Sequence, residues 1–368
     1  MTKSNSELKA ALIWTLALRL VYSAAGVIAA PYLKLNQALV FSNDLTENLM
    51  PREAGWAYRL LGVWERFDTL WYLEIAQRGY ARPDAVVFFP LYPALIRLLS
   101  FLVSPLTAAL IVSTVAAFFV FWGFQKLLRL DLPEDVVKRA LLFFALWPSA
   151  FILFAGYPES LLIALMIWAV WFARGGRWWL AGVLGLLAGL TKAVGFCIVV
   201  PLAVLAFKEW RWRTWPSFLP LLAAPLVTLT IWLSGNSLAS DAYPKHWRTE
   251  IAFPLVTLWA SLREAFTSLD AVLLLNLTAL AAIFTPAFVK RIRAEYLLFN
   301  LATLLMFLTK KTDPLLQSSS RYVLAVFPAF ASLAAFVKHP FFVALGLVLM
   351  CLLQFVLLWS FFEWALVV

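Results

Sequence analysis

The stretch that decides the fold is WWLAGVLGLLAGLTKAVGFCIVVPLAVLAFK, residues 178–208. It belongs to a chain of 368 residues that is 63% hydrophobic and only 14% charged, a composition typical of integral membrane proteins. As one helix the stretch would be too long for a bilayer and would put Arg177 and Lys208 on opposite sides. Two short helices that meet near residues 191–195 keep both cations on one side. The pattern therefore predicts a broken helix pair, with Lys192 in a wet cavity beneath the outer surface and not in lipid.

Basic residues elsewhere in the chain follow the same one-sided pattern. If eleven apolar segments span the membrane, six groups of basic residues fall on one face, which is identified as cytoplasmic. These groups are Lys3 and Lys9, Lys126 to Arg139, Arg174 and Arg177, Lys208 to Arg213, Lys290 to Arg293, and Lys338. All but six of the 20 acidic residues fall on the other face. We therefore expect an all-α polytopic membrane protein with about 11 transmembrane helices, a cytoplasmic N-terminus and an external C-terminus. The candidate spans are residues 8–31, 104–127, 140–156, 158–174, 178–191, 194–208, 216–234, 271–289, 295–309, 321–337 and 341–362.

The longest segment between spans is expected to carry interfacial helices. Its end, residues 88–99, is apolar but is broken by Pro90 and Pro93 and carries Arg97, which favours an interfacial helix over a span. The whole chain, residues 1–368, is expected to be a single transmembrane domain. Its parts are a first outer loop at 32–103, core spans at 104–208 around a second outer loop at 156–160, and C-terminal spans at 209–368.

A polar stretch, RFDTLWYLEIAQRGY at residues 66–80, lies within the first outer loop. Asp68 begins an amphipathic pattern and therefore suits the N-cap of a membrane-surface helix. The same position suits a general base, because the tip of a surface helix is where a lipid-linked substrate would present its head group. Trp71, Tyr72 and Tyr80 would stack on sugar rings and seat the helix at the interface.

A second acid and two cations complete the candidate site. Glu159 lies in the tight turn AGYPES, residues 155–160, either as a helix-start acid after Pro158 or as a functional carboxylate held close to the membrane. Lys192 and Arg321 would both suit a phosphate or pyrophosphate that links a lipid to a sugar. For Arg321, snorkelling to the membrane surface is the structural alternative.

Other chemistries find little support in the sequence. Two histidines, His246 and His339, and two cysteines, Cys197 and Cys351, form no ligand cluster, so neither a metal site nor a disulfide framework is expected. There is no phosphate-cradling Gly-rich motif, so no cytosolic nucleotide-sugar or ATP site and no cofactor are expected. The net charge of +10 comes without a basic run and indicates topology, not nucleic-acid binding. The outer loop 236–247 is interpreted as solvated.

Five motifs follow one another along the chain, FDTLWYLEIAQRGY (67–80), VFFPLYP (87–93), GYPESL (156–161), LTKAVG (190–195) and RYVLAVFP (321–328). At these residues the chain resembles the PIG-V family, the GPI mannosyltransferase 2-like branch of the GT-C membrane glycosyltransferases. Two positions depart from the family pattern, since Phe67 stands where Trp is usual and Lys192 where Arg is common.

The resemblance implies an enzyme that takes mannose from a polyprenyl-phosphate donor and transfers it, with inversion, to the hydroxyl of a glycan or glycolipid acceptor. The family's acids of the first and second outer loops map onto Asp68 and Glu159. Asp68 would accept the proton of the attacking hydroxyl, and Lys192 and Arg321 would stabilise charge on the departing phosphate. The expected substrate-binding residues are Arg66, Trp71, Tyr72, Tyr80, Tyr157, Lys192, Arg321 and Tyr322. The expected location is a bacterial plasma membrane, with the active site facing outside.

Two other functions stay open at this point. A lipid-linked sugar transporter or flippase would need ionisable groups near the bilayer midplane and often related halves, whereas the acids here gather at one face. A non-catalytic subunit of a glycosyltransferase complex is the second alternative, against which the intact Asp68 and Glu159 argue. A divalent cation between these two acids is also an alternative to a metal-free site. The sugar, the acceptor and the length of the carrier lipid stay open as well.

Overall fold

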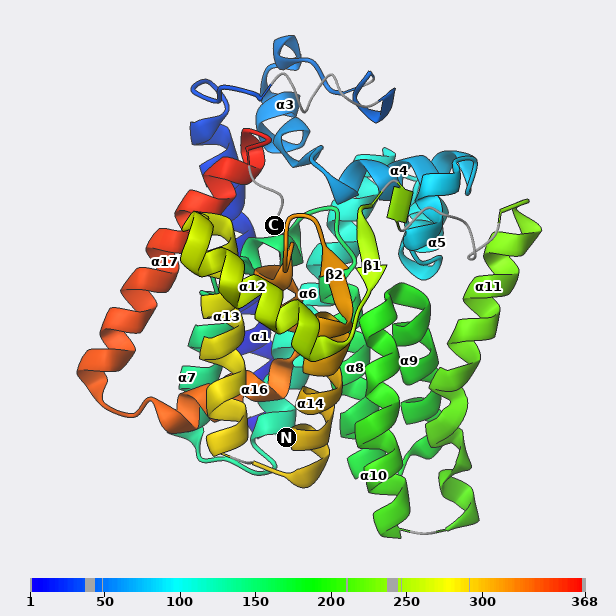
Figure 1. Cartoon of the computed structure of the whole chain (residues 1–368), viewed down its shortest axis with the longest axis vertical. Coiled ribbons are helices and arrows are strands. Elements are labelled where there is room, and N and C mark those ends of the chain that lie inside the picture. The colour runs from blue at the N-terminus through cyan, green and yellow to red at the C-terminus, as the bar shows by residue number, and fades with distance from the viewer. Residues whose placement is uncertain are drawn as a thin grey trace.

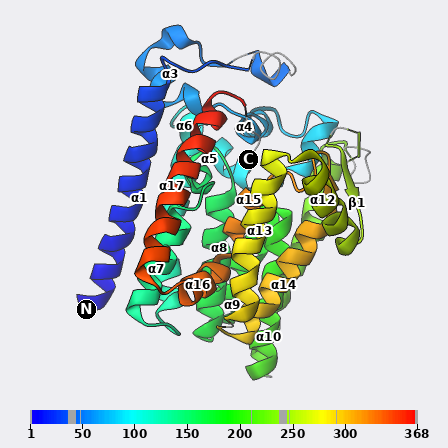
Figure 2. The ribbon, with the colours of Figure 1, turned by 60° about the vertical axis from the view of Figure 1, so that its left-hand side comes forward.

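The computed structural model describes residues 2–36, 44–47, 49–209, 211–236, 244–245, 247–290 and 292–365. In this part of the chain nearly all regular structure is helical, as predicted. Long helices run side by side, and the short helices α3 (Trp56–Leu60), α4 (Asp68–Arg78) and α5 (Leu91–Leu99) gather at one end of the molecule (Figures 1 and 2). We call this the loop end, and the opposite end, where α1 begins, the N-terminal end.

The helices follow one another along the chain with short connections. The first half contains α1 (Thr2–Ala29), α6 (Pro105–Leu128), α7 (Glu134–Ala145), α8 (Glu159–Arg174), α9 (Trp178–Thr191) and α10 (Val199–Glu209). The second half contains α11 (Ala223–Leu233), α12 (Pro254–Ser268), α13 (Ala271–Val289), α14 (Ala294–Thr309), α15 (Ser319–Tyr322), α16 (Phe327–Phe336) and α17 (Pro340–Phe362). Short 3-10 segments include η1 (Asp44–Thr46), η2 (Arg52–Ala54), η3 (Gly62–Trp64), η4 (Pro83–Val87), η5 (Ala150–Phe154), η6 (Ala193–Ile198), η7 (Trp212–Leu222) and η9 (Val323–Ala325).

Fewer helices than predicted are long enough to cross a membrane. Among the described residues, five helical stretches pass by length and composition, and a sixth is added if the pair that bends by 92° between α15 and α16 is one span. Each predicted span contains helical segments, but α8, α9 and α14 have only 16, 14 and 16 residues. Helices this short are tolerated where protein surrounds them, and α8 packs between α6 and α9. The five stretches are Asn5–Ala29, Pro105–Leu128, Trp212–Leu233, Ala271–Val289 and Pro340–Phe362.

The predicted break near Lys192 is confirmed. Helix α9 ends at Thr191, Lys192 is extended with φ −165° and ψ 152°, and the chain continues into η6 and α10. Gly195 permits this close turn, because a Cβ atom there would lie 2.1 Å from the carbonyl oxygen of Ala188. Lys192 is thus held at the junction of two short helices.

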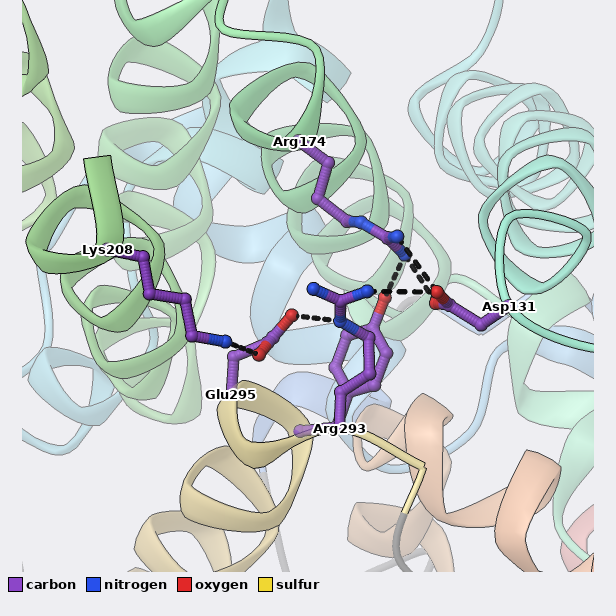
Figure 3. Close-up of polar contacts among 6 residues, drawn as sticks. Asp131, Arg174, Lys208, Arg293 and Glu295 are labelled. Carbon is purple, nitrogen blue, oxygen red and sulfur yellow. Dashed lines mark hydrogen bonds and ion pairs between the residues drawn. The ribbon is translucent and has the colours of Figure 1, made fainter.

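An ion-pair network joins four segments at the N-terminal end. Asp131, between α6 and α7, pairs with Arg174 of α8 and, at 3.0 Å, with Arg293 (Figure 3). Glu295 of α14 pairs with Arg293 and, at 2.7 Å, with Lys208 of α10. The predicted gathering of these basic residues at one end of the bundle is confirmed.

The loop end contains structure that the sequence did not predict. Strands β1 (Thr249–Ile251) and β2 (Lys310–Thr312) form an antiparallel pair, with Ile251 opposite Lys310. Helix α17 also ends here, since the N–H of Asn36 donates to the carbonyl oxygen of Glu363 at 2.9 Å. The end of α17 is therefore opposite to the start of α1, as the predicted topology requires. Most of the predicted loop 236–247, including Asp241 and His246, lies outside the described residues.

Candidate active site

Four charged side chains from separate parts of the sequence form a continuous chain of ion pairs at the loop end. Arg321 Nη1 donates to Asp68 Oδ2 at 2.8 Å, and Arg321 Nε lies 3.2 Å from Glu159 Oε1. Lys192 Nζ donates to the same oxygen of Glu159 at 2.6 Å. The structure thus brings together two predicted catalytic acids and two predicted phosphate-binding cations, in the order Asp68, Arg321, Glu159, Lys192.

Each of these residues lies at or near the end of a helix. Asp68 and Glu159 are the first residues of α4 and α8, Lys192 follows the last residue of α9, and Arg321 lies in α15. The two acids approach each other because Gly156 packs on α4, where a Cβ atom would lie only 2.5 Å from Thr69 Cγ2. Glycine is therefore required for the turn to fit against α4.

Phe67, and not Asp68, occupies the N-cap position of α4, and no side chain caps this helix. The prediction that Asp68 is the N-cap is therefore wrong by one residue, and the carboxylate is free to pair with Arg321. Phe67 has φ 48°, a conformation that is unusual for a bulky residue. Its ring packs 4.9 Å from that of Trp364 and 5.7 Å from that of Phe361, between ring centres. Strained backbone of this kind gathers at functional sites.

Burial separates the roles of the two carboxylates. The side chain of Asp68 is 19% exposed and borders a cavity of about 320 Å³, whereas that of Glu159 is 3% exposed and is not among the residues that line it. Asp68 is therefore the acid that a ligand in the cavity can reach. Glu159 forms ion pairs with Arg321 and Lys192 but does not line the cavity. Arg321 occupies the space between the acids, and the described residues contain no group of three metal-ligating side chains.

Two tyrosines support the cations. The guanidinium carbon of Arg321 lies 5.1 Å from the ring centres of both Tyr157 and Tyr322, and Lys192 Nζ lies 4.5 Å from that of Tyr322. These are cation–π distances. The hydroxyl of Tyr157 also accepts a hydrogen bond from the backbone N–H of Asp68 at 3.3 Å. Both predicted tyrosines thus contact the ion pairs.

Tyr72 of α4 borders the same cavity. Burial, together with the nearby charge of Asp68, raises the pKa of Tyr72 well above its usual range. Its phenol is therefore neutral at physiological pH and keeps a proton to donate to a ligand. This position agrees with the predicted role in substrate binding.

Tyr157 and three other predicted substrate-binding residues are not among those that line the cavity. Arg66 is buried, and its Nε donates to the carbonyl oxygen of Phe362 at 2.8 Å. Trp71 stacks on Phe88 with ring centres 5.5 Å apart, and the hydroxyl of Tyr80 donates to the carbonyl oxygen of Phe88 at 2.7 Å. Because Phe88 lines the cavity, Trp71 and Tyr80 support its wall. A direct role in binding stays a prediction for all four.

Lys310 borders the cavity and was missed by the sequence analysis. It begins β2, and its Nζ lies 5.8 Å from the ring centre of Tyr322. No motif marks this position. The available signal was weaker, namely two consecutive lysines, Lys310 and Lys311, on the face where acids predominate.

The fold and the site together define a helical membrane protein with a charged cavity at one end of its bundle. The family model described as Mannosyltransferase (PIG-V) matches residues 34–206, a segment that contains Asp68, Glu159 and Lys192. Over that segment the match bears out the predicted resemblance to the PIG-V family, and it supports a membrane mannosyltransferase. Arg321 lies beyond the matched segment. No curated protein and no solved structure matches the chain significantly.

Proposed function

We propose that this protein is a GT-C-type membrane glycosyltransferase that moves mannose from a polyprenyl-phosphate donor to an acceptor hydroxyl with inversion. The observation that carries the proposal is the ion-pair chain from Asp68 to Lys192 at the edge of a cavity. At about 320 Å³, that cavity lies within the size range of small-molecule sites. A reachable carboxylate beside two cations is the arrangement that such a transfer needs.

In the proposed reaction Asp68 is the general base. The acceptor oxygen attacks C1 of the sugar from the face opposite the phosphate and gives its proton to the Asp68 carboxylate. The bond from C1 to the phosphate oxygen breaks, and its electron pair leaves with the phosphate. Arg321 and Lys192 stabilise the charge that grows there. Glu159 does not touch the substrate and acts as a positioning residue for both cations.

The distribution of charge supports a proposed orientation in the membrane. Because the basic residues gather at the N-terminal end, we place that end in the cytoplasm and the cavity at the outer face. The plasma membrane of a bacterium is the proposed location. In this arrangement the five long stretches, the bent pair α15–α16 and the short helices α7, α8, α9, α10 and α14 make eleven crossings.

The test uses purified protein in lipid nanodiscs, a panel of polyprenyl-phosphate sugars and a panel of glycan and glycolipid acceptors. We expect transfer from the mannose donor by the wild-type protein and loss of transfer in Asp68→Asn. The rival function as a flippase is tested in liposomes with a labelled carrier lipid. Translocation of the carrier without any sugar transfer would reject the proposal in favour of the transporter.

A further inference from the structure

We propose that Lys310 holds the phosphate of the donor and thereby sets the affinity of the site for polyprenyl-phosphate sugars. This inference rests on the proposed function and assigns a residue to its phosphate subsite. It concerns a residue that lies outside every motif of the sequence and outside the segment matched by the family model.

The ion pairs of the site leave Lys310 as its uncompensated cation. Lys192 pairs with Glu159 at 2.6 Å, and Arg321 pairs with both Asp68 and Glu159. Among the described residues, Lys310 has no carboxylate within ion-pair distance. Three cations and two carboxylates give the site a net charge of +1. The diester phosphate of a polyprenyl-phosphate sugar carries a single negative charge, so the donor neutralises the site.

The geometry places this unpaired charge beside the other two cations. Nζ of Lys310, Nζ of Lys192 and the guanidinium carbon of Arg321 lie 5.8, 4.5 and 5.1 Å from the ring centre of Tyr322. All four residues line the same cavity. An anion bound in this cavity therefore meets Lys310 without having to displace a carboxylate.

The strand pair directs Lys310 toward the cavity. Alternate residues of a strand point to opposite faces, and both Lys310 and Thr312 line the cavity while Lys311 between them does not. The strand is fixed on both sides, since Lys310 is paired with Ile251 of β1 and the Thr312 hydroxyl donates to the carbonyl oxygen of Pro314 at 2.8 Å. Lys311 therefore provides a control of the same charge on the same strand.

The charge balance is also kept through the proposed reaction. When the Asp68 carboxylate accepts the proton of the acceptor, the site rises from +1 to +2. The phosphate that leaves becomes a monoester, which carries a charge of about −1.5 to −2 near pH 7. Once Asp68 is protonated, Arg321 pairs with the additional negative charge on the departing phosphate. Lys310 contacts the phosphate both before and after transfer. Lys310 should therefore contribute mainly to donor binding, and Arg321 mainly to the rate.

The experiment compares Lys310→Met with Lys311→Met in the full-length protein in nanodiscs. Steady-state kinetics give KM for the polyprenyl-phosphate mannose donor, KM for the acceptor and kcat, and free polyprenyl phosphate serves as a competitive probe. We expect Lys310→Met to raise the donor KM and the inhibition constant of free polyprenyl phosphate about 10- to 100-fold. This is the loss of affinity expected when one charge-assisted hydrogen bond to the phosphate is removed. The acceptor KM should not change. Lys311→Met should behave as the wild type, and Lys310→Arg should restore donor affinity.

Two results would separate this inference from the proposed function. If the wild type transfers mannose and Lys310→Met has the donor KM of Lys311→Met, the inference is overturned and the proposed function stands. If the wild type transfers no sugar from any polyprenyl-phosphate donor, the proposed function fails and this inference fails with it. Should Lys310→Met unfold, Lys310→Gln replaces it, because the amide keeps polarity while removing the charge.

Discussion

Two charge clusters at opposite ends of the bundle have the same composition and different geometry. Each contains three cations and two carboxylates, and in each an arginine bridges both acids while a lysine pairs with the glutamate. The loop-end cluster consists of Asp68, Glu159, Lys192, Lys310 and Arg321. The N-terminal-end cluster consists of Asp131, Arg174, Lys208, Arg293 and Glu295 (Figure 3).

The clusters differ in the partner of the third cation. Arg174 pairs with Asp131, so every charge of the N-terminal-end cluster has an opposite neighbour. Lys310 has none among the described residues and borders a cavity. A fully paired network ties helices together, whereas an unpaired cation beside a cavity provides a site for an anion. The comparison teaches that charge composition alone does not distinguish a fully paired cluster from one with an unpaired cation at a cavity.

The largest expected effect follows from removing the proposed base. Asp68→Asn keeps the side-chain shape and an oxygen that can accept from Arg321, but it cannot take a proton from the acceptor. We expect kcat to fall about 100- to 10,000-fold, the usual contribution of general base catalysis. Thermal unfolding should stay close to that of the wild type, because Arg321 keeps its pair with Glu159. A variant with near-wild-type turnover would show that Asp68 is not the base.

Glu159→Gln should reduce both activity and stability. The change leaves Arg321 and Lys192 without their shared buried partner, and breaking a buried pair costs about 3–5 kcal/mol. The rate per folded molecule should fall as well, because both cations lose their positions. The measurement is unfolding by denaturant together with initial rates. Glu74→Gln is the control, since Glu74 forms an exposed pair with Arg78 of the kind worth about 0–1 kcal/mol. Equal stability of the two variants would contradict the positioning role.

Asp131→Asn makes at the N-terminal end the same change that Asp68→Asn makes at the loop end. Arg174 loses its carboxylate partner and Arg293 loses one of its two, so we expect a loss of about 1–3 kcal/mol in the free energy of unfolding. The donor KM and the rate per folded molecule should not change, because this cluster lies far from the cavity. A specific loss of kcat in folded Asp131→Asn protein would break the distinction between the two clusters.

The smallest effect is expected for Lys192→Arg. The guanidinium keeps the charge and the pair with Glu159, and the family pattern often places arginine at this position. We expect a change below about 1 kcal/mol in donor binding, or about fivefold in KM. Lys192→Met, measured beside it, should lose donor affinity and stability together, because Lys192 is a partner of buried Glu159. Unchanged donor affinity in stable Lys192→Met protein would remove Lys192 from the phosphate subsite.

Much of the site was predictable because its signals are local. The break at Lys192 follows from the length of one apolar run between two cations. Asp68 and Glu159 each stand in a polar motif beside apolar segments, and both are first residues of helices, although the predicted N-cap role of Asp68 is wrong by one residue. Such features depend on a few neighbouring residues, which a sequence displays directly.

The remaining features depend on contacts between distant residues. Arg321 pairs with a residue 253 positions away, so its sequence context permits either snorkelling or an ion pair. Lys310 is directed into the cavity by a three-residue strand, which is too short for an alternating pattern to be recognised. The number of long helices was overestimated for the same reason. An apolar run predicts burial, and helices such as α9 are buried by their neighbours as well as by lipid.

The most direct test of the account compares Asp68→Asn with Asp131→Asn in one assay. The measurement is the initial rate of mannose transfer from polyprenyl-phosphate mannose, normalised to the amount of folded protein in nanodiscs. We predict that Asp68→Asn loses at least about 100-fold in rate while remaining folded, and that Asp131→Asn keeps the wild-type rate while being less stable. Equal rates in the two variants would contradict the claim that the loop-end cluster is the catalytic one.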